Sequence, residues 1–153
     1  MPMYQKLRDH QRSKVYKWER THIAPYDHTP VPYENIKAIV DYVWANEGLL
    51  YPPCVEPMPK QKHALGDATR TTVRFVPTTY SWVILHELSH ALSSNIQETE
   101  ILAEGLSNQH GAIFMGIYVN LLSKYLHLDV QELIQSAEAI GLRVNPFAKP
   151  VFL

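Results

Sequence analysis

The spacing of apolar residues predicts helices over most of the chain. Residues 33–46 carry apolar side chains at helical intervals, with Pro32 before the first turn and Gly48 just past the last, as at many helix ends. Other helices are predicted over residues 4–19, 79–93, 109–125 and 129–140. The last of these opens with Asp129 three residues before Glu132, a pairing typical of a capped helix start.

Prolines and β-branched residues mark the segments between the helices. Residues 21–32 contain three prolines and are predicted to be a connector. Residues 51–59 contain four, which allows a loop or at most an edge strand. Residues 62–77 predict a hairpin that turns at Gly66-Asp67, with residues 71–76 as its second strand. That strand is either an ordinary sheet strand or one that adds an extended peptide along its edge.

These elements predict an α+β fold, mostly helical, with a small antiparallel or mixed sheet beside the helix over residues 79–93. The chain has 153 residues, of which 46% are hydrophobic and 19% are charged. This length and composition predict one packed domain over residues 1–153. Fourteen basic and fifteen acidic residues give a net charge of −1, so composition provides no overall attraction to nucleic acid or anionic lipid.

The single cysteine and the lack of long apolar runs predict a cytoplasmic protein. Cys54 is the single cysteine, which excludes a disulfide within the chain and suits a reducing compartment. No stretch approaches the roughly 18 apolar residues of a membrane span. Residues 1–20 are rich in charge and lack the apolar run of a secretory signal, so none is expected there.

Residues 86–90 have the sequence His-Glu-Leu-Ser-His within a predicted helix. Because His86 and His90 are four residues apart, their imidazoles share one face, where both can bind one Zn²⁺. Glu87 lies about 100° further round the helix, where it can act as general base on a metal-bound water. Apolar residues occupy the opposite side, so the His-Glu face is predicted to look outward into a groove. This composition gives such a match only about 0.03 times by chance, which favours a metal site.

A catalytic zinc site needs a third protein ligand and an open position for water. The metzincin pattern is excluded, because Ser93 and Ile96 stand where it requires glycine and histidine. His110 is the favoured third ligand, since it opens a helix whose apolar residues would pack against the motif helix. The alternatives left open are Glu98, Glu100, Glu104 and His63. The remaining histidines are predicted to lie on the surface: His10, His22, His28 and His127.

The block 82–121, in which the motif is followed by His110-Gly-x-x-Phe114, resembles the SprT-like and WLM groups of minimal zincin metallopeptidases. Residues 9–19 and 71–74 are similar to those of a group of small uncharacterised metallohydrolases of bacteria and their phages. The resemblance implies a zincin-like domain with zinc ligands His86, His90 and His110 and with Glu87 as base. Many SprT-like proteins add a cysteine-rich zinc ribbon for DNA, which a single cysteine cannot build, so action at DNA–protein crosslinks is not expected.

The implied activity is hydrolysis of a peptide or other amide bond in a peptide or protein substrate. Zinc would lower the pKa of its water toward about 7, and Glu87 would take the proton and pass it to the leaving amine. Candidates for stabilising the oxyanion are Tyr80, Arg74 and Tyr118. The alternative is a non-enzymatic zinc-binding or assembly module with the same fold. Glu87 favours the enzyme, because a structural site usually closes with a fourth Cys or His.

Overall fold

The computed structural model describes residues 11–59, 64–93 and 110–150, which form the predicted α+β fold. The α-helices of this part are α1 (Arg12–Trp18), α2 (Tyr33–Asn46), α3 (Ser81–Ser93), α5 (Ala112–Leu126) and α6 (Val130–Ala139). The strands are β1 (Pro30–Pro32), β2 (Cys54–Pro57), β3 (Gly66–Ala68), β4 (Thr72–Phe75) and β5 (Thr78–Tyr80). None of the helices in these ranges has the length and apolarity that a membrane span requires.

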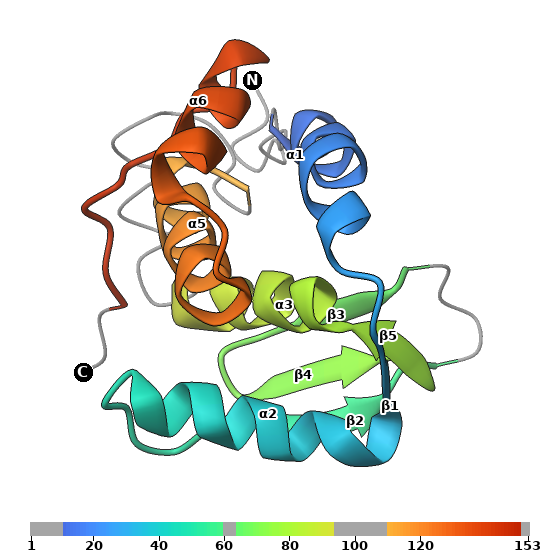
Figure 1. Cartoon of the computed structure of the whole chain (residues 1–153). Helices are drawn as coiled ribbons and strands as arrows, with labels where there is room; N and C mark the ends of the chain where they lie inside the picture. The colour runs from blue at the N-terminus through green and yellow to red at the C-terminus, as the bar shows by residue number, and fades with distance from the viewer. Residues whose placement is uncertain (1–10, 60–63, 94–109, 151–153) are drawn as a thin grey trace, which may run out of the picture.

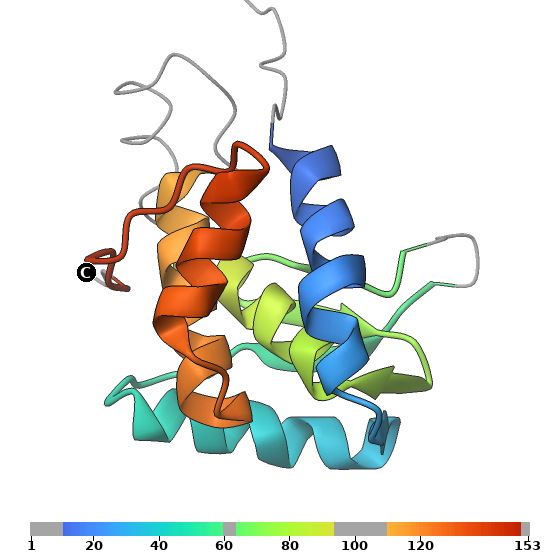
Figure 2. The same ribbon diagram turned by 45° about the horizontal axis from the view of Figure 1, so that its top comes forward.

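Helix α3 lies at the centre of the molecule. The sheet of β2, β4 and β3 lies between α3 and α2, while α1, α5 and α6 lie on the opposite side of α3 (Figure 1). Figure 2 shows α1 and the α5–α6 pair standing above α2 in the turned view. As a result, residues 83–93 are buried except for His90, which is partly buried. The His-Glu face was predicted to look outward into a groove. His86 and Glu87 do line a cavity, but both are buried because α1 packs over that face.

The central strand β4 is paired on both sides. It runs parallel to β2, with Cys54 opposite Thr72, and antiparallel to β3, with Asp67 opposite Arg74. Because both edges of β4 carry partners, this strand is the ordinary sheet strand of the two alternatives, and the alternative of peptide addition along its edge is excluded. The edge strand β2 agrees with the prediction for the proline-rich segment 51–59.

The hairpin of β3 and β4 is present, but its turn lies later than predicted. Asp67 stays within β3 because its carboxylate forms a two-point ion pair with the Arg74 guanidinium across the strands. The chain turns instead at Thr69, whose backbone N–H donates to the Thr72 carbonyl at 2.8 Å. The Thr69 hydroxyl accepts from the Thr72 N–H at 3.2 Å, a local bond that suits a turn.

The segment before α2 is more ordered than a connector. After α1 the chain continues as a π-helix, η1 (Glu19–Ile23), and a 3-10 helix, η2 (Ala24–Tyr26). Strand β1 then pairs antiparallel with β5, with Val31 opposite Thr79. The predicted connector over residues 21–32 thus contains short regular elements of its own. The helical assignment of Thr79 is wrong, because this residue lies in β5 and α3 begins at Ser81.

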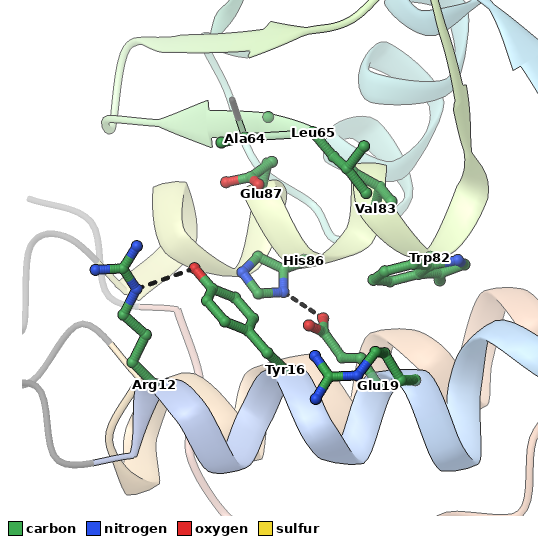
Figure 3. Close-up of a pocket in the computed structure, with 11 residues that line it drawn as sticks. Arg12, Tyr16, Glu19, Ala64, Leu65, Trp82, Val83, His86 and Glu87 are labelled. Carbon is green, nitrogen blue, oxygen red and sulfur yellow. Dashed lines mark hydrogen bonds and ion pairs between the residues drawn. The ribbon is translucent and has the colours of Figure 1, made fainter. Parts of the chain in front are cut away.

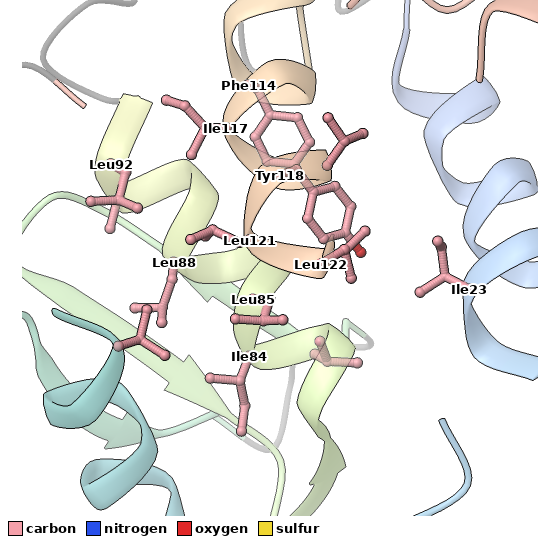
Figure 4. Close-up of a cluster of buried hydrophobic side chains, with 14 of the residues drawn as sticks. Ile23, Ile84, Leu85, Leu88, Leu92, Phe114, Ile117, Tyr118, Leu121 and Leu122 are labelled. Atoms are coloured by element: carbon pink, nitrogen blue, oxygen red, sulfur yellow. The ribbon is translucent and has the colours of Figure 1, made fainter. Parts of the chain in front are cut away.

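Helix α3 is aligned with α5 by a shared apolar core. Figure 4 shows Leu85, Leu88 and Leu92 of α3 beside Phe114, Ile117 and Leu121 of α5, and all six are buried. Burying each such side chain contributes roughly 1.5–3 kcal/mol, so this contact fixes the position of α3 relative to α5.

At the start of α6, the Asp129 carboxylate accepts from the Glu132 N–H at 3.0 Å, which confirms the predicted cap.

Candidate metal centre

Three histidines meet where α3 packs against the start of α5. His86 and His90 lie one turn apart on α3, and His110 stands two residues before α5 begins. One nitrogen from each ring lies within 4.8 Å of the others, so the three can hold a metal ion. This arrangement brings together the three residues that the sequence predicted as ligands.

The spacing of the ring nitrogens fits a tetrahedral ion. The Nε2 atoms of His90 and His110 are 3.2 Å apart. Two ligands bound at about 2.0–2.1 Å in a tetrahedral site are separated by about 3.3 Å, which is close to this distance. Burial, together with the nearby His86 and His110, holds the pKa of His90 well below its ordinary value. His90 is therefore in the neutral form that binds metals.

The first residue of η1, directly after α1, supplies an unpredicted partner for the cluster, the buried carboxylate of Glu19. Its Oε2 atom lies 2.5 Å from Nδ1 of His86 and accepts from the Tyr118 hydroxyl at 2.7 Å. Burial alone would lower the pKa of His86, but the charges of Glu19 and Glu87 outweigh it, so the net shift is upward. Because Nδ1 of His86 faces Glu19, Nε2 is the nitrogen available to a metal.

Glu19 could have been suspected from the sequence. It lies on the same helical stripe as Val15 and Trp18, both fully buried, so its carboxylate also had to be buried. A buried carboxylate requires a partner of its own. Nothing in the spacing, however, pointed to His86, which is 67 residues further along the chain.

Glu87 is buried beside the histidines, with 6% of its surface exposed. Burial is the largest effect on its carboxyl group and raises the pKa to about 7. Among the described residues no hydrogen bond engages this side chain. Strand β3 passes close to it, because a Cβ added at Gly66 would lie 3.1 Å from Glu87 Oε2 and 2.9 Å from the Arg74 carbonyl oxygen. Glycine at position 66 thus leaves room for the Glu87 carboxylate.

A cavity of about 650 Å³ opens onto Glu87 and His86. Its other walls come from α1, with Tyr16, from η1, with Glu19, and from the segment that leads into β3, with Leu65. Figure 3 shows Tyr16 of α1 and Glu19 of η1 facing His86 on α3. Of the three histidines, His86 is the one that lines this cavity, and Glu87 lines it as well.

The other histidines and the alternative third ligands of the sequence analysis can be placed only in part. Glu98, Glu100, Glu104, His63 and His10 lie outside the described residues. His28 and His127 are exposed as predicted, whereas His22 is half-buried.

The three candidates for stabilising the oxyanion differ in burial and in their hydrogen-bond partners. Arg74 is engaged by Asp67, and the Tyr118 hydroxyl donates to Glu19. Tyr80 ends β5 as a largely exposed side chain and is not among the residues that line the cavity. Tyr118 is fully buried, as expected for aromatic core packing.

Comparisons with known proteins return no relationship. No protein-family model matches the chain. Searches of curated proteins and of solved structures also give no match. The function is therefore argued from the residues of the site and from the sequence resemblance.

Proposed function

We propose that this protein is a zinc-dependent hydrolase, a metallopeptidase that cleaves peptide or other amide bonds with Glu87 as general base. His86, His90 and His110 would bind the metal. A divalent ion held there would lower the pKa of its water and polarise the substrate carbonyl. The sequence resemblance to minimal zincins supports the same proposal.

The position of Glu87 is the observation that carries this proposal. Its carboxyl group follows a metal-binding histidine, lies on the cavity wall, and is not engaged by a structural hydrogen bond among the described residues. A purely structural metal site has no use for such a group, because burying a carboxyl beside the ligands costs stability. A general base must reach both the attacking water and the leaving nitrogen, and a cavity-facing carboxylate can do so.

The other residues of the site orient this chemistry. Glu19 holds the His86 ring through Nδ1, and Tyr118 holds Glu19 in turn. The Gln11 side chain donates to the His110 carbonyl at 2.6 Å, which ties the start of α1 to the third histidine. Glu87 would accept the proton of the attacking water and release it to the leaving amine.

The edge strand β3 supports a peptide substrate. Within the described sheet its one partner is β4, and its Gly66 lies against Glu87. A peptide that added along this edge would be bound through its backbone close to the base. The exposed thiol of Cys54 is consistent with a reducing compartment, and we place this activity in the cytoplasm.

The test compares zinc-loaded wild type with the variant Glu87→Gln. Both proteins are incubated with unfolded casein and with a mixed peptide library, and products are identified by mass spectrometry. Because the amide cannot accept a proton at neutral pH, we expect equal zinc content and a rate lowered by about 10²- to 10⁴-fold.

The matched control is Glu138→Gln, which changes an exposed carboxylate on α6 in the same way. It should cleave as the wild type does. If Glu87→Gln cleaves as fast as the control, Glu87 is not the base. If the zinc-loaded wild type cleaves neither casein nor the peptide library, the peptidase proposal is wrong and a binding or assembly module becomes the better reading.

A further inference from the structure

Tyr16 is a residue of the cavity wall to which the proposed function gives no role. Its ring centroid lies 5.6 Å from that of His110 and 6.3 Å from that of His86, so it packs against two of the three histidines. Its side chain remains 37% exposed, unlike the fully buried Tyr118. Figure 3 shows it rising from α1 beside His86, and it lines the same cavity as Glu87.

The Tyr16 hydroxyl is suited to donate a hydrogen bond into the cavity. Arg12, one turn earlier on α1, donates from Nε to the Tyr16 hydroxyl oxygen at 3.4 Å. This contact uses a lone pair of the oxygen, so the phenol proton can be offered to another acceptor. The cavity wall also holds N–H donors on Arg12, Arg20 and Trp82. Among the described residues that line the cavity, Tyr16 is the donor whose own ring contacts two of the histidines.

Hydrogen bonds near both ends of α1 hold the helix that carries Tyr16 in place. At the start of α1, Gln11 donates to the His110 carbonyl and accepts from the Arg143 N–H at 2.7 Å. Further along, Trp18 donates from Nε1 to Ser136 of α6 at 2.8 Å. A donor anchored in this way needs little rearrangement when charge develops beside it, which is the condition for effective electrostatic stabilisation.

We propose that Tyr16 is a catalytic residue whose hydroxyl donates a hydrogen bond to the carbonyl oxygen of the scissile amide. This inference rests on the proposed hydrolase function. As the water oxygen bonds to the carbonyl carbon, the π electrons of the carbonyl move onto its oxygen, which becomes an oxyanion. Glu87 carries the proton from water to the leaving nitrogen as the C–N bond breaks. Tyr16 keeps its own proton throughout, so no further reactant is required.

The test measures how tightly the site binds an anion that mimics the oxyanion, without requiring substrate cleavage. Protein is loaded with Co²⁺, and the binding of acetohydroxamate, a metal-binding anion, is followed by the visible absorption of the metal. Tyr16→Phe removes the hydroxyl and keeps the ring that packs on the histidines. Because a hydrogen bond to a charged acceptor is lost, we expect acetohydroxamate to bind about tenfold to a hundredfold more weakly, with cobalt uptake unchanged.

The matched control is Tyr26→Phe, which removes the hydroxyl of a largely exposed tyrosine on η2. It should bind acetohydroxamate as the wild type does. Equal affinity in Tyr16→Phe and wild type would overturn the role of Tyr16 and leave the proposed function standing. Loss of cobalt uptake in Tyr16→Phe would also overturn it, since the hydroxyl would then serve the metal site. Failure of the wild type to take up cobalt would refute both proposals.

A cleavage assay separates a catalytic from a packing role. If the wild type cleaves casein or the peptide library, Tyr16→Phe should lower kcat by about 10²- to 10³-fold with little change in KM, because the lost bond strengthens only in the transition state. A rise in KM at unchanged kcat would contradict this assignment.

Discussion

At the scale of single residues, the candidate centre depends on a carboxylate that lies outside the His-Glu-x-x-His motif. Glu19 has 3% of its surface exposed and receives contacts from both His86 and Tyr118 on one oxygen. Such a group fixes the ring orientation of a ligand histidine and makes it a stronger base toward the metal. Its effect should therefore appear in metal affinity.

Substituting Glu19 with glutamine tests this arrangement. The amide oxygen still accepts a hydrogen bond, so the fold should be retained, but the negative charge opposite His86 is lost. We expect the zinc dissociation constant to rise about 10- to 100-fold, measured by competition with a chromophoric chelator. Glu34→Gln, an exposed change on α2, serves as the control. Equal affinity in Glu19→Gln and the control would mean that Glu19 does not orient a metal ligand.

At the scale of elements, the parts that could be predicted are those whose signal is local. Helix α2 was predicted at its observed bounds because its apolar spacing and flanking residues are all within the segment. The turn between β3 and β4 was misplaced because Gly66 suggested a turn, whereas it is a glycine of close approach to Glu87. The role of residues 11–19 could not be predicted, because their contacts with His86 and His110 join residues far apart in sequence.

Metal removal should affect the elements unequally. Helix α3 carries two of the histidines and the segment just before α5 carries the third, so without metal these two elements lose a crosslink, whereas α2 and α6 carry none of the three. We expect backbone amides near residues 86–90 and 110–114 to exchange hydrogen faster after chelation, with little change in α2 and α6. Hydrogen exchange followed by mass spectrometry gives this comparison. Unfolding of the whole chain on chelation would contradict it and assign the metal a mainly structural role.

At the scale of the whole molecule, the fold class and the histidine cluster could be predicted from the sequence. The burial of that cluster beneath the neighbouring elements could not. The periodicity of residues 79–93 and 109–125 predicted two packed helices, and this packing brings His110 to His86 and His90. The burial of α3 on nearly all sides arises from α1, α5 and the sheet together. This burial depends on how the elements pack in the complete domain, so the apolar pattern of α3 alone cannot predict it.

The central claim is that these three histidines form one metal site, and zinc binding by single-histidine variants tests it most directly. The experiment compares the wild type with three variants, His86→Ala, His90→Ala and His110→Ala, and with the exposed control His127→Ala. Each protein is dialysed against zinc, its bound zinc is measured by elemental mass spectrometry, and its folding is checked by circular dichroism. We predict about one zinc per chain in wild type and control, and a strong loss of affinity in the other three. A wild type that binds no zinc, or a folded His110→Ala variant with undiminished affinity, would contradict the account.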